Sequence, residues 1–291
     1  MKQYYHCASK GLEDEILFRT EEEFIAGMNR IGLCYLLSLK SHPVIILAFC
    51  LMDNHVHFIL YGTYEDCIRF MDDYKKLTGL WLAFHRDKKG TLKDWKHEAW
   101  LIPNAEMLKE KMAYVHRNPI VANINLVPNG YRWSSASLYF TDKTMFSKIL
   151  LPVNGLSQRE RRSLFNTKIE FPDDWRYLPG GEIWSGCYTE FKRIEAVFKT
   201  AWNYQYEMNK RVEEKVNSEI MAERVSLPDG DVLKMASEIS ARMFGEYDID
   251  LLTVKQRIKL CMALRKEVGG NIGQLSRIVH IQPKELREII G

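Results

Sequence analysis

Hydrophobic and polar positions follow two different periods along the first 140 residues, and together these periods predict alternating strands and helices. The strand-length apolar runs are residues 4–9, 44–52, 55–62 and 95–102. Apolar residues recur at helical spacing in three further segments, which are 24–35, 64–87 and 107–115. The resulting order predicts an α+β sandwich, in which an antiparallel or mixed sheet carries helices on one face.

Turn residues predict where these elements end. Asp53-Asn54 lies between two apolar runs, and because both residue types tolerate positive φ angles, the pair predicts a tight hairpin. Pro103-Asn104 predicts the start of the third helix. The dipeptide Asn118-Pro119 predicts its end, since proline disfavours helical geometry in the residue before it. Residues 87–90 have the composition of a loop.

The pattern changes at about residue 141, and we predict three regions, 1–140, 141–228 and 229–291. The middle region is rich in turn residues and aromatic residues and is expected to be irregular at first. It is then expected to form one helix from Phe191 to about Glu223. The last region is predicted to be all-α.

Composition narrows the class of protein without naming a function. Hydrophobic residues make up 46% of the 291 residues, which is enough for folded cores, and the net charge is only +3. The six cysteines show no paired spacing, which is typical of a reducing cytoplasm. We find no secretory signal and no apolar run near the roughly 20 residues that span a bilayer, so a cytoplasmic location without a membrane partner is expected.

Two histidines stand one residue apart in the apolar run LMDNHVHFIL. On a strand, residues i and i+2 share a face, so His55 and His57 are expected to point the same way. Two imidazoles held side by side form half of a divalent-metal site. The same pattern is also typical of two partly exposed histidines that bond to their neighbours.

Tyr114 and Asn118 are four residues apart in KMAYVHRNPI, which places both side chains on one face of the predicted third helix. A tyrosine near a metal can act as a nucleophile, and an amide oxygen is a hard ligand that suits Mg²⁺ or Mn²⁺. Alternatively, Tyr114 packs in the core and Asn118 caps the helix.

Three motifs in this order resemble the single-tyrosine HUH transposases, and most of all the REP-associated tyrosine transposases. They are MDNHVHFIL, YVHRNPIVANI and YRWSSASLY, within residues 1–140. The chain departs from the family at Asp53, where proline is usual, and more distant relatives have glutamine in place of Asn118. The resemblance implies a ferredoxin-like sheet with helices on one face.

The resemblance also implies the chemistry of the site. His55, His57 and Asn118 would bind Mg²⁺ or Mn²⁺, and Tyr114 would attack single-stranded hairpin DNA to form a 5′-phosphotyrosine. Some relatives are dimers with the tyrosine helix supplied in trans, so a monomer and a homodimer both stay open.

Two other functions are compatible with parts of the same pattern. A domesticated protein on the same scaffold would bind hairpin DNA without cutting it. A nucleotide hydrolase of the histidine-triad kind would need a third histidine at position 59, where Ile59 stands.

Basic and aromatic residues near the motifs are candidate DNA contacts, because cations hold phosphates and indoles stack on unpaired bases. The candidates in the first region are Lys75, Lys76, Arg117, Arg132 and Trp133. A solvated helix face and a core tryptophan explain the same residues equally well.

Residues 254–290 read as a helix, a short helix, a turn and a final helix, which resembles a helix-turn-helix. Lys284 and Arg287 of the final helix are candidate contacts to flanking duplex DNA, although Glu285 and Glu288 are unusual for a helix in the major groove. A helical cap that serves packing or dimerisation is the alternative. If this region only reads DNA, its removal should leave the cleavage chemistry intact.

Overall fold

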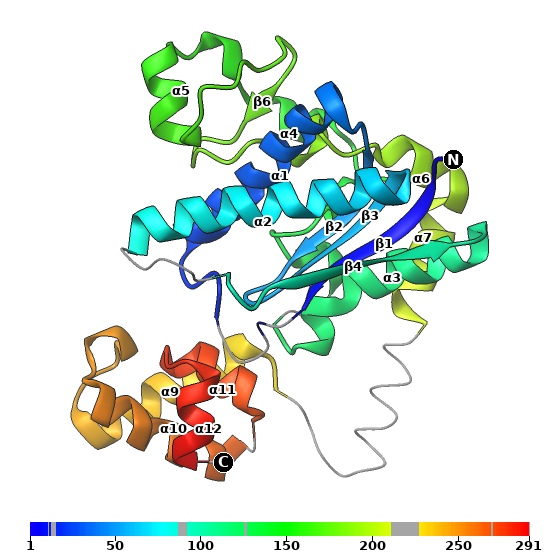
Figure 1. Ribbon diagram of the computed structural model, residues 1–291. Helices are drawn as coiled ribbons and strands as arrows, with labels where there is room; N and C mark the ends of the chain where they lie inside the picture. The colour runs from blue at the N-terminus through cyan, green and yellow to red at the C-terminus, as the bar shows by residue number, and fades with distance from the viewer. Residues whose placement is uncertain are drawn as a thin grey trace.

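The computed structural model describes residues 1–10, 12, 16–86, 92–124, 127–210, 227–268 and 270–290 (Figure 1). The elements of the first region are β1 (Gln3–Lys10), α1 (Glu21–Ser41), β2 (Ile45–Leu51), β3 (Val56–Gly62), α2 (Tyr64–Arg86), β4 (Lys96–Ile102) and α3 (Ala105–Val121). Their strands form one antiparallel sheet in the order β2-β3-β1-β4. The predicted α+β class and element order are therefore confirmed, whereas the predicted loop 87–90 lies outside the described residues.

The two faces of this sheet carry different helices. Tyr5, Phe58 and their neighbours pack against α1 and α2 in one core, while Ile59 and Met112 belong to a second core under α3. Figure 1 shows α1 and α2 on one side of the sheet and α3 on the other. The prediction that all helices share one face was wrong, because a strand such as β2 is apolar at nearly every position and must be covered on both faces.

Helix α3 begins as predicted and ends later. Asn104 caps its start by accepting a hydrogen bond from the Met107 N–H at 2.9 Å. Pro119 lies inside the helix, so the prediction that the helix ends at Asn118 was wrong. Because Pro119 has no N–H, the Val115 carbonyl loses its usual donor. The Asn118 Nδ2 group compensates by donating to the carbonyls of Tyr114 and Val115, at 2.9 and 3.4 Å.

The middle region is irregular at first, with only short elements. They are α4 (Thr144–Ser147), β5 (Leu151–Pro152), α5 (Gln158–Phe165), β6 (Arg176–Tyr177), α6 (Phe191–Phe198) and α7 (Ala201–Asn209), with 3₁₀ turns at Val153–Gly155 and Ser185–Cys187. Two further 3₁₀ turns, Pro128–Gly130 and Ala136–Leu138, lie before them at the end of the first region. The single helix predicted from Phe191 was wrong, because Lys199 has a φ of 68° and Thr200 caps a new helix. The rest of that prediction, from residue 211, lies outside the described residues.

The last region folds around a hydrophobic cluster of its own. Its helices are α9 (Asp229–Phe244), α10 (Val254–Val268), α11 (Ile272–Val279) and α12 (Pro283–Ile290), with a 3₁₀ turn at Ile249–Leu251, and we call them the C-terminal bundle. Leu260, Leu275 and Leu286 are completely buried at its centre. Within the described part of the chain, no helix is both long and apolar enough to cross a membrane.

Candidate active site

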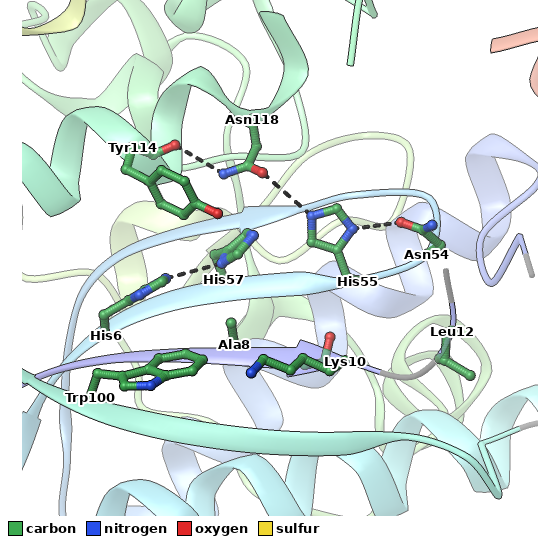
Figure 2. Close-up of a pocket in the computed structure, with 11 residues that line it drawn as sticks. His6, Ala8, Lys10, Leu12, Asn54, His55, His57, Trp100, Tyr114 and Asn118 are labelled. Atoms are coloured by element: carbon green, nitrogen blue, oxygen red, sulfur yellow. Dashed lines mark hydrogen bonds between the residues drawn. The ribbon is translucent and has the colours of Figure 1, made fainter. Parts of the chain in front are cut away.

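The four residues that the sequence singles out lie around one open pocket of about 270 Å³ on the α3 face of the sheet (Figure 2). His55 and His57 come from the β2–β3 hairpin, and Tyr114 and Asn118 come from α3. The hairpin and the helix are joined only by tertiary packing at this point, because the two histidines precede the helix residues by more than 50 positions. The structure thus brings the two predicted motifs together.

His55 lies in the turn directly before β3 and not within the strand. Its Nδ1 atom is 2.5 Å from the Asn54 side-chain oxygen, and its Nε2 atom is 3.5 Å from the Asn118 side-chain oxygen. Its ring lies 4.9 Å from the ring of His57, at an interplanar angle of 88°. Asn54 therefore orients the His55 ring so that Nε2 faces the helix.

Asn118 presents its amide oxygen to the histidines because its nitrogen is already used. The Nδ2 group donates back to the helix carbonyls that surround Pro119. The remaining amide atom, Oδ1, therefore faces His55. The local break in helix bonding at Pro119 fixes the side chain that faces the hairpin.

Tyr114 is 45% exposed, so its phenol is open to a solute in the pocket. The ring edges approach His57 and His6, with centroids 5.4 and 5.6 Å away. The Lys111 ammonium lies 5.6 Å from the phenol ring centroid. Within the described residues, the Tyr114 hydroxyl makes no hydrogen bond. The phenol is held by its ring and leaves its oxygen available.

His6 on β1 belongs to the same site and was missed by the sequence analysis. Its Nε2 atom lies 3.1 Å from Nδ1 of His57, and the two rings stack at 5.2 Å. The only signal in the sequence was the alternation in YYHCAS, and this cannot show which strand lies beside β1.

Burial keeps these two imidazoles neutral. It lowers the pKa of His6 to about 4, with the Lys111 charge adding to the effect. Burial, followed by the nearby charges of His55 and His6, lowers the pKa of His57 well below its ordinary value. A neutral imidazole is the form that binds a metal ion, so neither ring would have to lose a proton near neutral pH to act as a ligand.

The donors fit a divalent cation in their chemistry and spacing. Two ligands that sit about 2.1 Å from one cation at a right angle lie about 3.0 Å apart, close to the 3.5 Å between His55 Nε2 and Asn118 Oδ1. In the described residues no group of three or more His, Cys, Asp or Glu side chains is arranged for a metal. A cation here therefore needs the amide oxygen of Asn118 beside the histidines.

The predicted DNA contacts of the first region have partners inside the protein in most cases. Lys75 donates to the Trp95 carbonyl at 2.8 Å, and the buried Arg117 donates to the Ala113 carbonyl at 3.1 Å. Lys76 is exposed, as are Lys284 and Arg287, the candidates in the last region. Lys75 and Arg117 thus have structural bonds that a DNA role would have to replace.

Arg132 and Trp133 lie away from the pocket that holds Tyr114. Arg132 forms ion pairs with Glu21 and Glu182 and lies 4.5 Å from the Trp133 ring centroid. Trp133 also stacks on Phe24 at 5.0 Å. Neither residue lines the pocket.

Three residues that line or border the pocket were not among the predicted DNA contacts. Trp100 is 38% exposed and stacks on His6 at 5.4 Å. Lys10 lies 4.8 Å from the Trp100 ring centroid and pairs with Glu98, and Lys111 lies beside Tyr114. An indole and two ammonium groups therefore surround the entrance to the candidate site.

Three comparisons with known proteins give one match, to a solved structure. No protein-family model and no curated protein matches the chain. Among solved structures, the chain is similar to a REP-associated tyrosine transposase bound to a REP hairpin. The sequence identity is 12% and the TM-score is 0.37, and the alignment covers 60% of this chain and 92% of that chain.

Proposed function

We propose that this protein is a metal-dependent single-strand DNA endonuclease and strand transferase of the transposase type, which cleaves and rejoins hairpin-forming DNA through a 5′-phosphotyrosine. One observation carries the proposal: a half-exposed tyrosine on α3 shares one open pocket with two histidines and an asparagine oxygen. The motif resemblance described above adds the substrate class.

The reaction balances without an external energy source. The Tyr114 oxygen attacks the scissile phosphorus and forms a P–O bond, while the bond from phosphorus to the 3′ oxygen breaks. The phenol proton leaves to solvent, and the departing 3′ oxygen takes up a proton and becomes a hydroxyl. Attack of a 3′-hydroxyl on the phosphotyrosine reverses these steps and rejoins a strand. One phosphodiester replaces another at each step, so no nucleotide cofactor is needed.

His55, His57 and Asn118 would hold Mg²⁺ or Mn²⁺ next to the scissile phosphate. In that position a cation would polarise the phosphate oxygens and neutralise the charge that develops on them. His6 contributes by its hydrogen bond to His57, because it fixes the orientation of that ring. The rigid hairpin and the side-chain bonds of Asn118 hold these donors in place before a substrate arrives.

The entrance of the pocket suits a single strand. Trp100 offers a partly exposed ring for stacking of an unpaired base, and Lys10 and Lys111 place positive charge near the path of the backbone. Base stacking on an aromatic ring contributes about 1–3 kcal/mol. We expect the nucleotides that flank the scissile phosphate to lie between Trp100 and Tyr114.

A trapping experiment with labelled DNA tests the proposal. The full chain is incubated with Mn²⁺ and a hairpin oligonucleotide that carries a label at its 5′ or its 3′ end. We expect a protease-sensitive band on a denaturing gel that keeps only the 3′ label, because the tyrosine bonds to the 5′ phosphate. In Tyr114→Phe the band should disappear, with the circular dichroism spectrum unchanged.

The matched control is Tyr206→Phe, which alters a tyrosine of similar exposure on α7. A covalent band that persists in Tyr114→Phe and disappears in the control would refute the assignment. A hairpin that shifts on a native gel without any covalent band would favour the alternative, a hairpin-binding protein that does not cut.

A further inference from the structure

A single guanidinium in the C-terminal bundle contacts residues next to both halves of the candidate site. Arg277 of α11 lies 3.6 Å from the Asp53 carboxylate and donates to the Ala122 carbonyl at 2.7 Å. Its Nε group also donates to Asp229 at 2.6 Å. The Arg277 side chain is only 17% exposed, so these bonds form in a largely dehydrated interface. We call this set of bonds the Arg277 clamp.

The Asp53 end of the clamp fixes the hairpin turn that carries His55. The Asp53 carbonyl accepts hydrogen bonds from the Leu17 and Phe18 N–H groups at 2.6 and 2.8 Å. Its carboxylate faces Arg277, and the next residue, Asn54, orients the His55 ring. The turn residue that supports the histidine is therefore bonded to the bundle.

The other end of the clamp fixes the end of α3, which carries Tyr114 and Asn118. The last turn of α3 has no basic residue, so the negative end of its helix dipole depends on other elements. Arg277 supplies that charge at Ala122, and the Asp229 N–H bonds to the Asn123 carbonyl at 2.8 Å. Two elements of the bundle thus cap the helix that holds the proposed nucleophile.

We propose that Arg277 is a positioning residue of the active site, and that the C-terminal bundle is a working part of the catalytic unit. By bonding to Asp53 and to Ala122, Arg277 sets the distance between the histidine hairpin and the tyrosine helix. This role rests on the proposed function and differs from duplex reading by a tethered domain. A proline at position 53, as in the family that the sequence resembles, has no carboxylate for such a bond.

Cleavage kinetics on a short single strand without flanking duplex test the clamp, since no duplex is then present for the bundle to read. We expect Arg277→Gln to lower kcat by about 10–100-fold with KM changed by less than about twofold, because misplacement by about 1 Å costs roughly 100-fold. Arg277→Lys keeps the positive charge but loses the several N–H donors of the guanidinium. Its kcat should lie between the values of wild type and Arg277→Gln.

Arg257→Gln is the matched control. Arg257 has a similar side-chain exposure of 16% and lines the same cavity between the bundle and the sheet. Among the described residues, its side chain bonds to Leu252 and Asp250, both within the bundle, so kcat of Arg257→Gln should stay within about twofold of wild type. The ion pair between Asp53 and Arg277 is lost in either single variant. In the double variant Asp53→Asn/Arg277→Gln, kcat should therefore be no lower than in Arg277→Gln.

A second measurement separates failure of the clamp from failure of the proposed function. Histidine-ring NMR resonances of the metal-free full chain report the surroundings of His55 and His57 without any reaction. We expect them to shift in Arg277→Gln and to stay in place in Arg257→Gln. Unchanged resonances together with a wild-type kcat in Arg277→Gln would overturn the clamp. If wild type cleaves no DNA, the resonances still decide on the clamp.

Should Arg277→Gln melt below the assay temperature, Arg277→Lys replaces it in both measurements. The proposal would also be overturned if folded Arg277→Lys had the kcat and the histidine-ring resonances of wild type and Asp53→Asn left both unchanged.

Discussion

Two clusters of histidine and tyrosine flank helix α3, and they differ in how completely their polar atoms are bonded. In the buried cluster, the His116 ring nitrogens lie 3.0 Å from the Ser135 hydroxyl and 3.0 Å from the Tyr204 hydroxyl. In the pocket cluster, His57 bonds to His6, and Tyr114 on the same helix is exposed. The first cluster is closed by its own hydrogen bonds, and the second is open to a solute.

Residues of the same types therefore have different roles in the two clusters. The buried cluster has a structural role, and the pocket cluster is the site of the proposed chemistry. The buried cluster ties α3 to the strand β2, because Ser135 also accepts from the Phe49 N–H at 3.0 Å and Tyr139 donates to the Leu47 carbonyl. It thereby sets the height of α3 above the sheet. The pocket cluster depends on that placement for the approach of Tyr114 and Asn118 to the histidines.

The largest effect that separates the clusters is on DNA cleavage. His57→Ala removes a proposed metal ligand, and we expect cleavage to fall by more than about 100-fold, since loss of even an outer partner of a metal site costs about 10–100-fold. Chelation of the metal from wild type should have the same effect, reversed by Mn²⁺. Gel-based cleavage rates and Mn²⁺ titration by calorimetry measure both. Wild-type rates in His57→Ala would remove the metal site from the mechanism.

The next effect is on stability and concerns the other cluster. His116→Leu leaves the buried Tyr204 hydroxyl without its hydrogen bond and removes one of several bonds of the Ser135 hydroxyl, so we expect the free energy of unfolding to drop by about 1–3 kcal/mol. Urea denaturation followed by circular dichroism gives the value. His57 borders an open pocket, so His57→Ala should lower the free energy of unfolding by less than His116→Leu does. The opposite ranking would show that the pocket cluster holds the fold together.

A smaller effect is the dependence of stability on pH. Burial lowers the pKa of His116 to about 3 in the folded chain, from an ordinary 6.5. The unfolded chain therefore binds a proton that the folded chain excludes, and stability falls as pH drops from 6.5 towards 3. This histidine contributes up to about 1.4 kcal/mol per pH unit. His116→Gln should flatten the curve of unfolding free energy between pH 4 and 6, and an unchanged slope would contradict the assignment.

The smallest effect compares one hydroxyl from each cluster. Tyr204→Phe deletes a buried hydrogen bond to His116 and should cost about 1 kcal/mol of unfolding free energy. Tyr114→Phe deletes a hydroxyl on a half-exposed ring, and its urea midpoint should stay near that of wild type. Equal losses in the two variants would mean that the Tyr114 hydroxyl has a structural partner.

Local patterns in the sequence were enough to predict the elements but not how they pair. The apolar runs and the Asp53-Asn54 turn gave the β2–β3 hairpin, and Asn104 gave the start of α3, because each signal spans a few residues. The face on which α3 packs was predicted wrongly, since an apolar strand gives no preference between its two faces.

The residues of the site divide in the same way. His55 and His57 are separated by one residue in the sequence, and the resemblance to the single-tyrosine transposases linked them to Tyr114 and Asn118. His6 joins them only through the pairing of β1 with β3, and Arg277 reaches Asp53 only through docking of the bundle. Such contacts depend on strand register and on packing between distant segments, which a single sequence does not reveal.

The contacts of the docked bundle also bear on the order of folding. Arg277 meets Ala122 across 155 residues, and Gln282 meets the Ile16 N–H across 266 residues, whereas the bundle has a hydrophobic cluster made from its own helices. Closing such long loops is slow compared with forming local helix contacts. The bundle and the sheet should therefore each fold before they join. In stopped-flow refolding, the proposed cleavage activity should return in a later phase than helical circular dichroism, so that the protein becomes competent only at its final assembly step.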